Sequence, residues 1–303
     1  MANLEEKLQK IKTVKGDIKA SIEQVGGKTL TDEFDTYPQA ILDLANGAVY
    51  THPEVFDERT NGGKNLAYLY YGATLPSNAM NNRSYPNAVN SSYMFSNITF
   101  GNTFSINNWN VPNLKTMDYM FSSMKAPTGY ANAISMYGWN CQPTSMKNMC
   151  ANNSKLQSIR FGYDPNETTV LGTTLDTSKV KTMKWIFSDC GNLIHIHGVL
   201  DLSSLSEGLY CESAYNSFFY GLTSLQTVYF TNIYKDCTIT NEQKWSVDLY
   251  RNTKLTNECI LGIINALPTI DPTFTNIWIR PPQSRGFVEN ERAILAEKNW
   301  TIK

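Results

Sequence analysis

The side chains best suited to chemistry lie close together in "SKVKTMKWIFSDCGNLIHIHG", residues 178–198. Cys190, His195 and His197, with an aspartate beside the cysteine, could ligate a metal or form a nucleophile with its base. The two histidines alternate along a predicted strand, so both imidazoles would lie on one face. A zinc site needs three or four ligands, and the only other histidine is His52. We therefore expect surface histidines on a strand, without a metal ion or other cofactor.

Other catalytic motifs are incomplete. "GGKTL" at 26–30 resembles the end of a P-loop, but the position of the required first glycine holds Ile22. Residues 61–140 contain Asp118 as their only acid, so they offer no pair of carboxylates for glycoside hydrolysis. We expect no enzymatic activity, and a glycan-active enzyme is kept only as a third alternative.

Apolar residues around the cysteine and the histidines recur elsewhere in the chain. Five segments superpose, beginning near residues 91, 116, 145, 182 and 214, and a degraded sixth copy surrounds Tyr250. The most regular shared positions are Phe95, Phe121, Cys150, Phe187 and Phe219, preceded by Met94, Met120, Met149, Ile186 and Phe218. In the three middle copies the Met-x-x-[Met/Ile]-[Phe/Cys] spacing predicts a helical turn, and where a Leu-x-x-[Ile/Val] pattern follows, it predicts a short strand.

The repeat assigns the two histidines to ordinary polar positions of this strand. The aligned sets are His195 with Ser158 and Thr227, and His197 with Arg160 and Tyr229. Neither set repeats a metal ligand, so the recurring feature is architectural.

Composition limits the partners of the chain. Its net charge is −1 and only 17% of its residues are charged, so no basic surface of the kind that binds nucleic acid is expected. No window approaches 18 consecutive apolar residues and no signal peptide is visible, which argues against membrane insertion and for synthesis in a cytoplasm. The six cysteines show no close CxxC pairing, so we expect buried thiols.

The N-terminus predicts one long amphipathic helix over residues 3–25, ended by two glycines. Its apolar stripe consists of Leu4, Leu8, Ile11, Val14, Ile18, Ile22 and Val25. Part of the stripe repeats every seven residues, so the helix could pack on the chain's own body or on other subunits. We assign the stripe to oligomerisation or docking, with a trimer as the expected oligomer. A second short helix is predicted over residues 38–45.

Residues 61–140 are neutral and rich in amides and aromatic rings, with fifteen Asn and eight Tyr. This composition favours turns joined by short strands. The side chains could fill the corners of a repeat, or they could form a neutral, hydrogen-bonding surface suited to glycans. On the second interpretation, the candidate ligand-facing residues of the chain are Tyr68, Tyr70, Tyr71, Trp109, Trp139, His195 and His197.

Two copies of the repeat carry a specific resemblance. "INNWNVPNLKTMDYMFSSM" (106–124) and "LDTSKVKTMKWIFSDCGNL" (175–193) resemble the BspA-like leucine-rich-repeat family, found in bacterial surface proteins and in phage virion proteins. The resemblance extends over roughly residues 91–260. "ERAILAEKNWTIK" resembles the closing segment of such domains, where a helix and a final strand cap the stack. The N-terminus resembles the leading segment of fibre and appendage proteins of phages infecting gut Bacteroidetes.

The resemblance implies an α+β fold: an N-terminal amphipathic helix followed by an irregular leucine-rich-repeat solenoid with short strands and helical turns. The expected parts are a helical anchor over 1–47, a connector over 48–90, repeats over 91–260 and a C-terminal cap over 261–303. The expected function is that of a non-enzymatic virion appendage, made in the host cytoplasm. It would contact other virion proteins and display the repeats to a host-surface glycan or protein. The alternative is a bacterial cell-surface adhesin with the same repeats.

Overall fold

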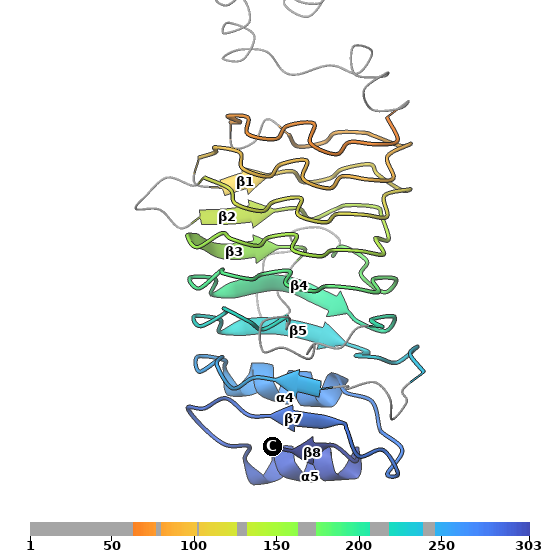
Figure 1. Ribbon diagram of the computed structural model, residues 1–303, viewed down its shortest axis with the longest axis vertical. Coiled ribbons are helices and arrows are strands. Elements are labelled where there is room, and N and C mark those ends of the chain that lie inside the picture. Colours follow the sequence, from red (N-terminus) through yellow and green to blue (C-terminus); the bar gives the residue numbers. More distant parts are fainter. Residues whose placement is uncertain are drawn as a thin grey trace, which may run out of the picture. The chain divides into compact units, whose positions relative to one another are not determined.

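The computed structural model describes residues 63–76, 80–101, 103–125, 132–162, 174–206, 218–238 and 246–303 (Figure 1). The chain divides into two compact units, Met1–Gly62 and Gly63–Lys303, and every described residue belongs to the second. The predicted helices over 3–25 and 38–45, and with them the apolar stripe from Leu4 to Val25, lie outside the described residues.

The described residues form two parallel β-sheets and two α-helices. Five strands pair in chain order in the first sheet (Figure 1): β1 (Thr103–Ser105), β2 (Asn132–Ser135), β3 (Leu156–Arg160), β4 (His195–Asp201) and β5 (Thr227–Thr231). The second sheet consists of β6 (Ser246–Asp248), β7 (Trp278–Arg280) and β8 (Thr301–Ile302). The helices are α4 (Asn257–Ala266) and α5 (Glu289–Glu297). This arrangement confirms the expected mixture of helix and strand.

Parallel pairing continues outside the strands. Single bridges join one position of each copy to the next in the series Asn65, Asn90, Thr116, Ser145 and Thr182. The steps between these residues are 25, 26, 29 and 37 residues, so each copy pairs with the copy that follows it in the chain. The repeat in the sequence is therefore also a repeat of backbone hydrogen bonding, and the insertions of variable length fall between paired positions.

The segments predicted as helical turns are consecutive β-turns instead. The first four copies each contain two residues with a positive φ four positions apart, such as Tyr93 (59°) and Asn97 (62°). A left-handed residue interrupts an α-helix. The backbone amides donate sideways to the next copy, as Phe95 N does to Met120 O at 2.9 Å. Apolar residues three positions apart arise here from turns, so the prediction of helical turns was wrong.

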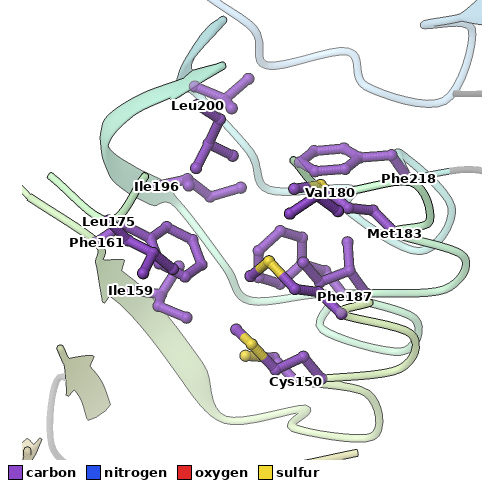
Figure 2. Close-up of a cluster of buried hydrophobic side chains, with 14 of the residues drawn as sticks. Cys150, Ile159, Phe161, Leu175, Val180, Met183, Phe187, Ile196, Leu200 and Phe218 are labelled. Atoms are coloured by element: carbon purple, nitrogen blue, oxygen red, sulfur yellow. The ribbon is translucent and has the colours of Figure 1, made fainter. Parts of the chain in front are cut away.

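The core lies between the strands and the turns. Ile159 on β3 and Ile196 on β4 are in register, and they face Cys150 and Phe187 from the turns (Figure 2). All four side chains are fully buried. Burying one large apolar side chain contributes about 1.5–3 kcal/mol, so these facing columns stabilise the contact between neighbouring copies.

The pairing of β4 follows the predicted register at its start and departs from it further on. His195 keeps its predicted partners on both neighbouring strands. Tyr229 is in register with Val199 rather than with His197, because a bulge between His195 and Val199 places two extra residues on β4. The bulge contains Gly198, whose φ is +100°. The alignment of His197 with Tyr229 was therefore wrong.

Polar contacts hold the ends of both helices. Lys298 Nζ donates to Asn265 O at 2.7 Å, near the end of α4. Glu291, which is 3% exposed, accepts from Arg285 at 2.7 Å and from Val288 N at 3.0 Å, at the start of α5. The expected closing helix and final strand are present as α5 and β8. Neither described helix is long and apolar enough to cross a membrane.

The five described cysteines are unbridged, and four of them are buried. Burial raises the pKa of the Cys190 thiol to about 12, and its Sγ donates to Cys150 O at 3.0 Å. Cys211 lies outside the described residues. The buried thiols pack as small apolar side chains, which confirms that part of the prediction.

Candidate functional site

Three tyrosines from successive copies form a stack of rings on the surface, the tyrosine ladder: Tyr68, Tyr93 and Tyr119. The ring centroids of Tyr68 and Tyr93 lie 4.7 Å apart with planes at 5°, and those of Tyr93 and Tyr119 lie 4.6 Å apart with planes at 4°. Tyr71 lies beside the first ring, 5.7 Å away and tilted by 55°. The spacing matches the distance between hydrogen-bonded strands, so the pairing of the copies sets the ladder.

The backbone under the ladder is left-handed at every tyrosine, with φ of 61°, 59° and 56° at Tyr68, Tyr93 and Tyr119. This conformation costs a residue with a bulky side chain about 1–2 kcal/mol, and asparagine tolerates it better. The next copy has Asn148 at the same turn position, with a φ of 51°. Tyrosine is thus placed three times where the backbone favours another residue, which points to a role for the rings.

Exposure of the rings differs along the ladder. Tyr68 is 55% exposed and Tyr71 is 51% exposed, whereas Tyr93 and Tyr119 are partly buried by their neighbours. The exposed pair forms an aromatic corner, because the two rings are tilted against each other. Such a corner offers apolar ring faces and phenol hydroxyls to one ligand.

The central ring of the ladder has a perturbed hydroxyl. Desolvation raises the pKa of Tyr93, and the neighbouring Tyr119, Tyr68 and Asp118 raise it further. Asp118 itself accepts hydrogen bonds from Ser145 Oγ at 2.5 Å and from the backbone amide of the following copy. The Tyr93 phenol is therefore protonated near neutral pH and can both donate and accept a hydrogen bond.

The asparagines of this region serve the architecture. Their side-chain amides bond to one another between copies: Asn90 Nδ2 donates to Asn65 Oδ1 at 3.1 Å, and Asn140 Nδ2 donates to Asn110 Oδ1 at 2.7 Å. Asn153 Nδ2 bonds to backbone carbonyls of two copies. These contacts favour the first of the two interpretations of the amide-rich composition, that the asparagines fill turns and corners.

Three of the aromatic residues named as candidates lie in the core. Tyr70, Trp109 and Trp139 are 7%, 1% and 3% exposed. The two indoles stack with centroids 5.0 Å apart, and Trp139 Nε1 donates to Ile106 O at 2.6 Å. The ring of Tyr70 stacks on Phe95 at 5.4 Å. A buried aromatic ring with a satisfied polar group packs the interior, so these three residues do not face a ligand.

The remaining candidates lie on or near the surface. Tyr68 and Tyr71 are exposed, as described above, and His195 is partly exposed on β4. His197 is 6% exposed, although its ring centroid lies only 5.5 Å from that of His195. In the described ranges no group of three or more His, Cys, Asp or Glu side chains could hold a metal ion.

The first copy of the repeat and two members of the ladder, Tyr93 and Tyr119, were not predicted from the sequence. Tyr70 N donates to Met94 O at 3.0 Å, so Tyr70 occupies the position of Phe95 one copy earlier. The signal was present in "NLAYLYYG", where Tyr68 stands two residues before Tyr70 as Tyr93 stands before Phe95. The first copy departs from the others because Tyr70 replaces Phe and Leu69 replaces Met.

The fold and the ladder together define a repeat protein of mixed helix and strand with parallel pairing between copies. A protein-family model described as "Mycoplasma protein of unknown function, DUF285" matches residues 55–163, which include the whole ladder. That repeat family is related to BspA-like surface proteins, in agreement with the resemblance carried by residues 106–124. No curated protein and no solved structure matches the chain.

Proposed function

We propose that residues 63–303 form a leucine-rich-repeat solenoid of the BspA-like type, and that this solenoid is a recognition module for a glycan on a host surface. The observation that carries the proposal is the tyrosine ladder, where three rings occupy strained turn positions and end in an exposed aromatic corner. The proposed activity is binding, without a catalytic step.

The solenoid is supported by the order of pairing. β1 to β5 pair only with their sequence neighbours, and the bridges from Asn65 to Thr182 repeat this order on the turn side. Copies that contact only the next copy, with loops inserted between paired positions, are the defining property of such repeat proteins.

A glycan is supported by the chemistry of the corner. Sugar rings present apolar C–H faces and many hydroxyls, and the tilted rings of Tyr68 and Tyr71 offer an apolar surface beside hydrogen-bonding phenol groups. The surrounding residues 61–140 carry one acid and four basic residues. The region is therefore close to neutral, as suits a ligand recognised by hydrogen bonds and apolar contacts. A full-chain glycan array tests the proposal: binding to surface polysaccharides is expected, and an array without any bound glycan would contradict it.

We further propose that residues 1–47 anchor the solenoid in a virion appendage, with the stripe from Leu4 to Val25 forming the oligomer or docking contact. This part rests on the amphipathic pattern and on the resemblance of the N-terminus to phage appendage proteins. Deletion of residues 1–26 should lower the mass measured by light scattering and abolish attachment to particles. An unchanged oligomer with intact attachment would disprove the anchoring role.

A bacterial cell-surface adhesin is the second candidate. It is favoured by the match of residues 55–163 to a family described from a Mycoplasma protein. Fractionation separates the two candidates, because an adhesin would be found in cell envelopes without any phage, whereas an appendage would co-purify with particles.

A further inference from the structure

One face of the first sheet gathers polar and basic side chains from three strands. Ser158 on β3, His195 on β4 and Thr227 on β5 are in register, and Arg160 on β3 is in register with His197 on β4. The residues that alternate with them, such as Ile159 and Ile196, are fully buried in the core. The five polar residues therefore share the opposite face, here called the histidine face.

The histidine face contains polar atoms that the fold leaves unsatisfied. Arg160 Nε and Ser158 Oγ are buried and have no hydrogen-bond partner within the part of the chain that the structure describes. A buried donor without an acceptor is destabilising, so such groups are rare in native structures and call for an explanation such as a ligand. No carboxylate neutralises the guanidinium from a paired position, because the residues in register with Arg160 are Ser135 and His197.

The histidines on this face are held in fixed positions. His195 Nδ1 shares a hydrogen bond with Thr227 Oγ1 at 2.9 Å, and the ring centroids of His195 and His197 lie 5.5 Å apart. Two imidazoles next to an arginine give a local positive potential when either ring is protonated. A metal cation is disfavoured by the same guanidinium, and an oxyanion is favoured.

We infer that the histidine face binds a carboxylate of an acidic sugar residue, such as a uronic acid. The inference rests on the proposed glycan recognition and names its ligand class. Arg160 would hold the planar carboxylate through its fork of N–H groups, Ser158 Oγ would donate a further hydrogen bond, and His195 would add an N–H donor. The neutral tyrosine ladder and the basic histidine face would then recognise different parts of one polysaccharide.

Histidine signals give a direct test, because the chain has three histidines and two of them lie on this face. The full chain with ¹³C-labelled histidine is titrated with sodium glucuronate, and the Cε1–H signals are assigned with His195→Gln and His197→Gln. Saturable shifts of His195 and His197, with His52 unchanged, are expected. Arg160→Gln should abolish the shifts, whereas Arg251→Gln, an exposed control of equal charge change, should leave them intact.

The outcomes separate this inference from the proposed function. Equal drift of all three signals, no shift, or full retention of the shifts in Arg160→Gln would overturn the inference. If Arg160→Gln fails to fold in a thermal melt, Ser158→Ala takes its place, with at least a threefold weaker affinity expected. A glucuronate-containing hexasaccharide should also bind at least tenfold more tightly than its carboxyl-reduced form. Equal binding of the two forms would overturn the acidic-sugar assignment while leaving glycan recognition in place.

Discussion

Gly198 in β4 lies against Gly162 so closely that a Cβ on Gly198 would be 2.8 Å from the backbone nitrogen of Gly162. The φ of Gly198 is +100°, in a region that side chains rarely adopt. The bulge that displaces Tyr229 from His197 therefore depends on a residue without a side chain.

Gly198→Ala should lower the free energy of unfolding by about 2–4 kcal/mol. The change combines backbone strain with a clash of the new Cβ against the backbone of Gly162. Urea denaturation followed by circular dichroism measures the change. Gly262→Ala is the matched control: Gly262 lies inside α4 with no atom within 4 Å of an added Cβ, so this change should stabilise the protein by about 0.5–1 kcal/mol. Equal effects of the two substitutions would contradict the account of the bulge.

Stability should fall in alkali because Cys190 is buried. Its pKa is raised by desolvation from 9.0 to about 12 in the folded protein. Between these values the unfolded chain has lost the proton that the folded chain retains, so the free energy of unfolding decreases as pH rises. The contribution of one such thiol is about 1.4 kcal/mol per pH unit.

Urea denaturation of wild type and Cys190→Ala at pH 8.5 and pH 10 measures this contribution. The variant should lose about 1 kcal/mol less than wild type between the two pH values, although it is less stable at both. Cys237→Ala, which replaces a less buried thiol, should give a smaller difference. Identical pH dependence of wild type and Cys190→Ala would show that Cys190 does not contribute.

Tyr93→Asn separates the stability of the ladder from its role in binding. Asparagine suits the left-handed φ of 59° and relieves strain, while the loss of ring stacking costs about 0.5–1.5 kcal/mol on each side. The two effects oppose each other, so we expect the free energy of unfolding to change by about 1 kcal/mol or less. Glycan affinity should nevertheless fall severalfold. A loss of several kcal/mol with unchanged affinity would make the ladder a purely structural feature.

The sequence allowed the repeat and its apolar columns to be predicted, because Phe95, Phe121 and Phe187 recur at positions where every copy needs a buried side chain. It also predicted that His195 is an ordinary strand position paired with Ser158 and Thr227. These features follow from burial, which leaves a clear pattern of apolar residues.

Other features could not be read from apolar spacing. Consecutive β-turns and helical turns both place apolar residues three positions apart, so only the backbone hydrogen bonds distinguish them. The bulge at Gly198 breaks the alternation of buried residues on β4, where Ile196, His197 and Gly198 are buried in succession, and apolar spacing gives no sign of this break. Trp109 and Trp139 were candidates for a ligand-facing surface, yet both are buried, and their indole N–H groups donate to the backbone carbonyls of Met80 and Ile106 in the core.

The most direct test of the central claim is calorimetry of the full chain against a polysaccharide identified on the array. Tyr68→Ala with Tyr71→Ala removes the exposed corner, and Tyr250→Ala removes an exposed tyrosine far along the chain as a control. The account predicts at least a tenfold weaker affinity, about 1.4 kcal/mol, for the double variant and unchanged affinity for the control. A folded double variant that binds the polysaccharide as tightly as wild type would contradict glycan recognition by the tyrosine ladder.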